Sequence, residues 1–179
     1  MVTNIVEAIQ QKLGYPPLKK VDPNTQEIKD ARKMSPEEKL PQAAIPSVLA
    51  AAIKYSDGKD GINLLSDKKN ENWLKLFYHD KEDDAVQKVA DYAGVAKDEA
   101  RKHMENISTE TVIFVRDAVR TQDAEKLRSF LNSQRHSILS HLPASMKMGD
   151  VLNEETFDDR TNKMEGPVSG FLHRIENII

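Results

Sequence analysis

Residues 35–55, SPEEKLPQAAIPSVLAAAIKY, carry the strongest helix start in the chain. Ser35 is suited to cap the helix, Pro36 then takes the first helical position, and Glu38 the third. Two further prolines, Pro41 and Pro46, each remove an amide donor from the helical hydrogen-bond ladder. The stretch therefore predicts a short helix followed by a longer one through residues 47–55.

The rest of the chain also favours helices. Seven glycines and eight prolines among 179 residues leave long uninterrupted stretches, and strand-like alternation of apolar and polar residues is nearly absent. The most strand-like run, TVIFV at residues 111–115, continues through Val119 at helical spacing. We predict an all-α bundle of about seven to nine helices, in a chain long enough for one domain or two small ones.

Local signals place the other helices and their connections. The first helix is expected to start at about Asn4, with Glu7 as its capping-box partner, and to stop at Gly14. The polar, proline-containing residues 15–34 are expected to form a linker or a loosely packed excursion. An amphipathic helix is expected over residues 123–142, ended by Pro143.

Two regions resemble each other in their apolar positions and in glycines 14 and 94. We interpret residues 4–65 and 84–131 as two degenerate helical units, the first with an insertion near 15–34. A chance match between amphipathic helices remains an alternative. The predicted domain organisation is a helical domain over residues 1–141 with a C-terminal helical arm, residues 142–179, packed on it.

The stretches MSPEEKLPQAAIPSVLAAAIKYSDGKDGINLL and VQKVADYAGVAKDEARKHMENI resemble the helical repeats of the YidB-like family, small bacterial proteins of unknown function. The likeness lies in helix entries of the form Gly-x-x-x-x-Glu, a proline-containing apolar helix and a Gly-x-x-x-Leu helix, over about a third of the chain. The resemblance implies an all-helical bacterial protein. It implies no catalytic residue and no cofactor.

Composition excludes several kinds of function. The chain has no cysteine, which removes disulfides, thiol nucleophiles and thiolate metal sites. Its net charge is −3 with both signs interspersed, and without a basic patch nucleic acid is not an expected partner. No run reaches the roughly 18 apolar residues of a membrane span, and the start does not resemble a signal peptide. We expect a cytoplasmic protein that needs no cofactor.

Residues 153–170, NEETFDDRTNKMEGPVSG, contain the densest group of carboxylates. Helix capping explains several of these residues, and an acidic metal site centred on Asp158, Asp159 and Arg160, with Glu165, is the alternative. Residues 56–67 also resemble a calcium loop at Asp60, Gly61 and Asp67, but depart from that pattern at other ligand positions. We therefore expect no metal site in either stretch. The candidate ligands, if a metal binds, are Asp60, Asp67, Asp158, Asp159 and Glu165.

Apolar residues suggest where a protein partner could dock. Trp73 and Phe77 form a stripe at helical spacing, for which burial in the core is the preferred interpretation and an anchor for a partner is the alternative. The arm adds adaptable methionines, and the partner-binding candidates are Trp73, Phe77, Met146, Met148, Phe171 and Leu172. We predict a non-enzymatic module for protein–protein interaction, self-association or regulation. A metal-dependent enzyme or metal-binding protein using residues 154–165 is the alternative.

Histidines occur in two arrangements with neighbouring groups that chemistry could use. His79 and Asp83 are four residues apart, a spacing that could place both on one face of a helix, although a pair alone is not a metal site. Ser137 and Ser140 lie close in sequence to His136 and His141. Since no nucleophile elbow surrounds these serines, the sequence gives hydrolase chemistry no support.

Overall fold

The computed structural model describes residues 4–65 and 72–158. In these residues it contains α-helices, short 3₁₀ helices and one isolated antiparallel bridge between Val21 and Ile28, with no β-strand, so the all-α prediction is confirmed. The α-helices are α1 (Ile5–Lys12), α2 (Pro36–Asp57), α3 (Trp73–Tyr78), α4 (Glu82–Ala93), α5 (Lys97–Val119), α6 (Ala124–Leu139) and α7 (Met148–Leu152). The 3₁₀ helices are η1 (Ala31–Lys33), η2 (Lys59–Leu65), η3 (His79–Lys81), η4 (Ala144–Met146) and η5 (Glu155–Phe157).

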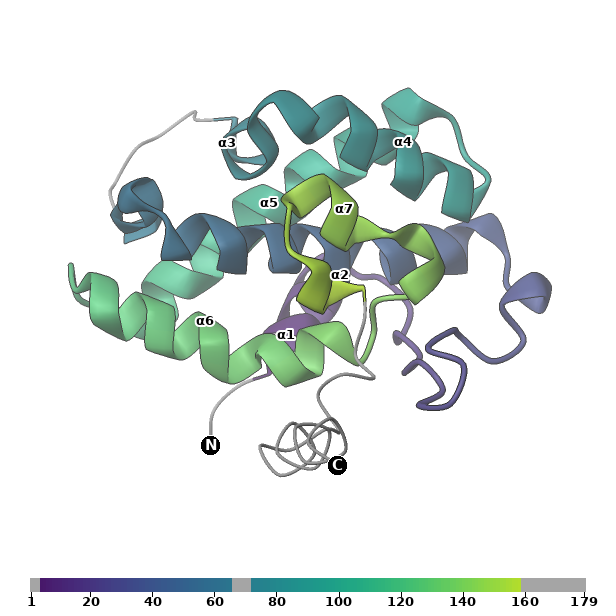
Figure 1. Ribbon diagram of the computed structural model, residues 1–179, viewed down its shortest axis with the longest axis horizontal. Helices are drawn as coiled ribbons and strands as arrows, with labels where there is room; N and C mark the ends of the chain where they lie inside the picture. The colour runs from purple at the N-terminus through teal and green to yellow at the C-terminus, as the bar shows by residue number, and fades with distance from the viewer. Residues whose placement is uncertain (1–3, 66–71, 159–179) are drawn as a thin grey trace, which may run out of the picture.

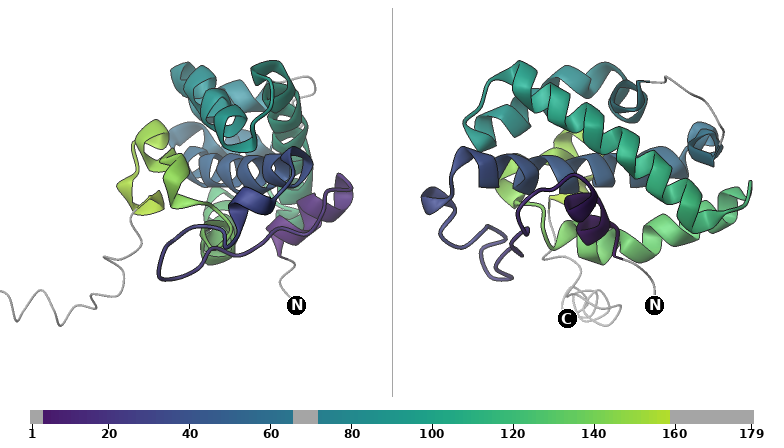
Figure 2. Two further views of the ribbon diagram at one scale, coloured as in Figure 1. Left: turned by 90° about the vertical axis from the view of Figure 1, so that its right-hand side faces the viewer. Right: turned by 180° about the vertical axis from the view of Figure 1, so that it is seen from behind.

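The fold is organised around α2, which is surrounded by other helices. It crosses the middle of the molecule, with α3 and α4 along one side and α6 along the opposite side (Figure 1). The view from behind shows α5 running across the back with α1 beside it (Figure 2), while α7 lies in front of α2 in Figure 1. Every residue from Leu40 to Ile53 is buried. A helix enclosed in this way must be apolar all round, which its alanine and branched aliphatic residues provide.

The two internal prolines do not divide α2, so the expectation of two successive helices is wrong. Pro41 and Pro46 lie inside one continuous helix, and both are buried. Each removes one backbone hydrogen bond. Because α2 is packed on all sides, tertiary contacts hold the helix together through both prolines. The predicted start is confirmed, since Ser35 Oγ accepts from the Glu38 N–H at 3.3 Å and Glu38 Oε2 from the Ser35 N–H at 2.9 Å.

Residues 15–34 are not a loose excursion but are hydrogen-bonded to the chain that follows α6. The Val21 N–H donates to the Ser140 carbonyl oxygen at 2.8 Å, and the Ala144 N–H donates to that of Gln26 at 3.0 Å. The carboxylate of Glu27 accepts from the Ser145 N–H at 2.6 Å and from its hydroxyl at 2.9 Å. Partners more than a hundred residues away therefore order this segment.

The other predicted helices form close to their expected bounds. Residues 111–115 lie within α5, which confirms a helix there. The Asn4 side chain caps α1 by accepting from the Val6 N–H, and Asp123 caps α6 by accepting from two backbone N–H groups. Glu7 accepts from the Asn4 side-chain amide at 3.2 Å, so it supports the cap through a side-chain pair.

The two proposed repeat units correspond in their helix boundaries. The first contains α1, a left-handed glycine at position 14 and α2; the second contains α4, a left-handed glycine at position 94 and α5. The φ values of the two glycines are 71° and 72°. Their surroundings differ, since α2 is enclosed by other helices while α5 keeps an exposed side. The repeat stays a prediction, as does the division into a domain and an arm.

The described part of the arm, residues 142–158, packs against the helical body. α7 contacts α2 and α4, and η4 contacts α4. Within the described residues, no helix combines the length and the apolar character that crossing a bilayer requires.

Candidate functional site

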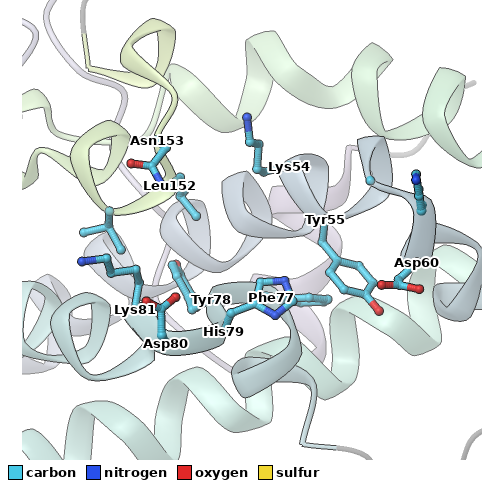
Figure 3. Close-up of a pocket in the computed structure, with 13 residues that line it drawn as sticks. Lys54, Tyr55, Asp60, Phe77, Tyr78, His79, Asp80, Lys81, Leu152 and Asn153 are labelled. Atoms are coloured by element: carbon cyan, nitrogen blue, oxygen red, sulfur yellow. The ribbon is translucent and has the colours of Figure 1, made fainter.

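A depression of about 300 Å³ opens at one corner of the bundle. It lies where the C-terminal end of α2 and the start of η2 meet the junction of α3 and η3 and the end of α7 (Figure 3). Three segments distant in sequence thus build one surface. We call it the corner depression, and its lining residues are Lys54, Tyr55, Gly58, Lys59, Asp60, Phe77, Tyr78, His79, Asp80, Lys81, Val151, Leu152 and Asn153.

Aromatic side chains form the floor of the corner depression. Tyr55, Phe77 and Tyr78 are all buried. The ring centroids of Tyr55 and Phe77 lie 5.6 Å apart, and those of Tyr55 and His79 lie 6.3 Å apart. The Tyr78 hydroxyl donates to the Ser47 carbonyl oxygen at 2.8 Å, and burial raises the pKa of this phenol. The floor is therefore a fixed part of the core, with its outer edge open to a ligand.

His79 stands at this edge with an unusual backbone. It ends α3 at φ 51° and ψ −122°, a conformation that side-chain-bearing residues rarely adopt. Such conformations cost about 1–3 kcal/mol and persist where the surrounding structure imposes them. The exposed imidazole lies between the Tyr55 ring and Asp80 in the view of Figure 3. Across the depression, Asn153 also has a positive φ, 50°, which asparagine tolerates.

Charged side chains surround the aromatic floor. Lys54, Lys59 and Lys81 contribute cations, while Asp60 and Asp80 contribute anions. Except for the half-buried Lys54, these residues are exposed. The corner depression thus combines an apolar floor with a rim of both signs, an arrangement suited to a peptide segment with one apolar and one charged side chain.

A chain of polar contacts leads from this rim into the arm. Lys54 Nζ lies 3.1 Å from Glu154 Oε2, and the Thr156 hydroxyl donates to Glu154 Oε1 at 2.7 Å. Arg135 donates to the Thr156 hydroxyl at 2.6 Å, and its guanidinium lies 4.5 Å from the centre of the buried Phe157 ring. Hydrogen bonds from Thr156 and then from Lys54 lower the pKa of Glu154. The carboxylate of Glu154 thus links the depression to the anchor of the arm.

The metal candidates do not assemble in the described residues. Asp158 accepts from the Gly149 N–H at 2.7 Å and the Asp150 N–H at 3.0 Å, and so caps α7. Burial raises the pKa of its carboxyl, although both hydrogen bonds oppose the rise. Asp60 lies on η2 at the rim of the corner depression. No group of three or more histidine, aspartate or glutamate side chains is placed to hold a metal in residues 4–65 and 72–158; Asp67, Asp159 and Glu165 lie outside these ranges.

Gly149 makes the capping contact of Asp158 possible. A Cβ atom at this position would lie 2.5 Å from the Asp158 carboxylate oxygen Oδ2 and 2.7 Å from the Glu154 carbonyl oxygen. Within residues 153–158, Asp158 therefore acts as a helix cap, while Glu154 contacts Lys54 and Thr156.

The partner-binding candidates that the structure describes are core residues. Trp73 and Phe77 are 4% and 3% exposed, and Met146 and Met148 are also buried. The guanidinium carbon of Arg116 lies over the Trp73 ring, 5.5 Å from the centre of that ring. These four side chains present little surface to a partner, apart from the edge of Phe77 at the corner depression. Phe171 and Leu172 lie outside the described residues.

The two histidine arrangements do not form reactive groups. Asp83 bonds to Lys97 at 2.5 Å and to Arg101 at 2.9 Å, and these cations lower the pKa of its carboxyl; His79 takes no part. The Ser137 hydroxyl donates to the Asn4 side chain, and the Ser140 hydroxyl donates to the Ser137 carbonyl oxygen. Ser140 Oγ also lies 3.4 Å from His141 Nδ1, but that nitrogen makes its shorter contact, 2.7 Å, with the Ser137 carbonyl oxygen.

Sequence reasoning missed most of the corner depression. Lys54, Tyr55, Lys81 and Asn153 belong to segments up to a hundred residues apart, and none carries a local motif. It also missed the contact between the Tyr15 hydroxyl and His103 Nδ1 at 2.6 Å, which joins the end of α1 to α5. Three lining residues carried a sequence signal: Asp60 through its resemblance to a calcium loop, Phe77 through the apolar stripe, and His79 through its spacing from Asp83.

Comparisons with known proteins identify no relative of this chain: no family model, no curated protein and no solved structure matches it.

Proposed function

We propose that the chain is a non-enzymatic protein–protein interaction module that binds a short segment of a partner protein at the corner depression. The observation that carries the proposal is the convergence of three distant segments on an aromatic floor with a charged rim. Interfaces use such arrangements, in which apolar contact supplies binding energy and polar groups at the rim set orientation.

The size of the depression supports a peptide side chain as the occupant. A volume of about 300 Å³ lies at the lower end of ligand sites, and accommodates one large side chain together with its neighbours. The backbone of His79 gives independent support, because strained residues cluster at binding and active sites.

Site-specific photocrosslinking in the native cell tests this proposal. A benzoylphenylalanine is placed at Lys81 or Asn153, both exposed on the rim, and in a control chain at Gln11, exposed on α1 away from the depression. We expect both rim positions to crosslink one and the same protein, identified by mass spectrometry, while the Gln11 control does not.

Two outcomes would contradict the proposal. Rim positions that give no product, or the same set of products as Gln11, would show that the corner depression is not a contact surface. Crosslinks between two copies of this chain would instead identify the surface as a site of self-association. Each product is re-tested in a chain that also carries Phe77→Ala, which removes part of the floor and should reduce a specific crosslink.

A further inference from the structure

Lys54, which lines the corner depression, already pairs with a carboxylate of its own chain. Glu154 reaches Lys54 with one oxygen at 3.1 Å and accepts from the Thr156 hydroxyl with the other. The pair is not sealed in the core, because the side chain of Lys54 is 41% exposed and that of Glu154 is 29% exposed. A carboxylate from outside can therefore approach the same lysine.

Exposure makes this ion pair easy to exchange. Pairs that water reaches contribute about 0.2–1 kcal/mol, so another carboxylate that also gains contact with the aromatic floor can displace Glu154. Lys59 and Lys81 line the same depression and add positive charge toward an incoming anion, while Asp60 and Asp80 oppose it. With Lys54, the three lysines exceed the two aspartates by one charge.

Displacement of Glu154 from Lys54 would change the contacts of the neighbouring residues in the arm. Its carboxylate is one end of the contacts that run through Thr156 to Arg135, whose guanidinium packs on Phe157. A ligand that takes over Lys54 leaves the Glu154 carboxylate with the Thr156 hydroxyl as its remaining hydrogen-bond partner in the described residues, and with the charge of Arg135 nearby. Thermodynamic linkage is reciprocal: if ligand binding at Lys54 weakens the contacts of residues 153–158, those contacts weaken ligand binding by the same factor.

We propose that the corner depression binds an acidic peptide of a partner protein, whose carboxylate replaces Glu154 at Lys54, so that peptide binding and docking of residues 153–158 oppose each other. The inference rests on the proposed function and adds to it the charge of the ligand and a built-in competitor. Glu154 occupies the lysine until an acidic segment with an apolar neighbour replaces it.

An NMR titration of the full chain tests the inference. The probe is a capped tripeptide with phenylalanine between two glutamates, and the comparison peptide carries two lysines instead. We expect the acidic probe to shift the amide signals of Lys54, His79 and Asn153, and also those of Thr156 and Phe157 in the arm. The basic peptide should leave all of them in place.

Matched variants isolate the competition. Glu154→Gln removes the competitor and should tighten binding of the acidic probe about 1.4- to 5-fold, the range that an exposed ion pair supplies. Glu155→Gln makes the same charge change at an exposed neighbour and should leave affinity unchanged. Lys54→Met should weaken binding of the acidic probe, whereas Lys102→Met, at an exposed position on α5, should leave it unchanged.

Three results would overturn the inference: no shift by the acidic probe, equal binding of the basic peptide, or equal affinities of Glu154→Gln and Glu155→Gln. None of them decides whether a protein docks at the depression, since crosslinking from Lys81 and Asn153 reports on that separately. A crosslinked partner together with a failed titration would leave the docking surface in place and reject its acidic ligand.

Discussion

The side-chain amide of Gln42, in the second turn of the buried helix α2, donates a hydrogen bond of 2.8 Å to the backbone carbonyl oxygen of His141, ninety-nine residues further along the chain. The same amide donates to the Lys19 carbonyl oxygen at 3.0 Å and accepts from the Lys19 N–H at 2.8 Å. One buried side chain thus joins α2 to both the segment before it and the turn after α6.

Replacing Gln42 should therefore destabilise the protein by more than the loss of a single hydrogen bond. In Gln42→Leu the backbone groups of Lys19 and His141 lose their partners, and we expect a loss of about 2–4 kcal/mol in the free energy of unfolding. Urea denaturation measures it, with Gln11→Leu on the exposed side of α1 as the control. A loss below about 0.5 kcal/mol, within the range of ordinary surface changes, would contradict a joining role for Gln42.

His141 should make stability depend on pH near neutrality. Its side chain is buried, and desolvation lowers the pKa of the imidazole below its ordinary value of 6.5, although the Ser137 carbonyl oxygen opposes the shift. Lys20 also lowers the pKa and Glu7 raises it. The unfolded chain thus binds a proton at a higher pH than the folded chain does. Stability is full above the unfolded pKa and falls as the pH drops through that value toward the folded pKa.

Urea denaturation between pH 7.5 and 5.5 tests this dependence. We expect wild type to lose stability across this window and His141→Gln to lose less, because glutamine does not titrate. His136→Gln, at an exposed position on α6, serves as the control and should follow wild type. Parallel curves for His141→Gln and wild type would show that other groups cause the dependence.

The backbone conformation of His79 should make glycine more stable than alanine at this position. Glycine adopts positive φ without the steric cost that a side chain carries, so His79→Gly should raise the free energy of unfolding by about 1 kcal/mol relative to His79→Ala. The comparison isolates the backbone, since both variants lack the imidazole. Thermal melts measure it, and an alanine variant as stable as the glycine variant would show that the conformation costs nothing here.

Asp158→Ala should act as the loss of a helix cap. We expect about 0.5–2 kcal/mol of destabilisation, because the N–H groups of Gly149 and Asp150 lose their acceptor. In thermal melts with EDTA, Ca²⁺, Mg²⁺, Mn²⁺ or Zn²⁺, the difference in midpoint between wild type and variant should stay the same. A midpoint that rises with one metal in wild type alone would return Asp158 to the metal candidates.

The sequence by itself determined the local features of this protein. The capping box at Ser35, the cap at Asp123 and the left-handed glycines 14 and 94 depend on groups within about four residues of each other, so their signals lie in short stretches. The all-α class likewise follows from composition and periodicity.

The tertiary structure decided the continuity of α2 and the contacts between residues distant in sequence. Packing on every side carries α2 through Pro41 and Pro46, where local rules predict a break. The corner depression joins Lys54, His79 and Asn153, and Gln42 meets Lys19 and His141. Such contacts form only when the whole chain is folded, because each depends on the distance between residues far apart in sequence, and no local pattern encodes that distance.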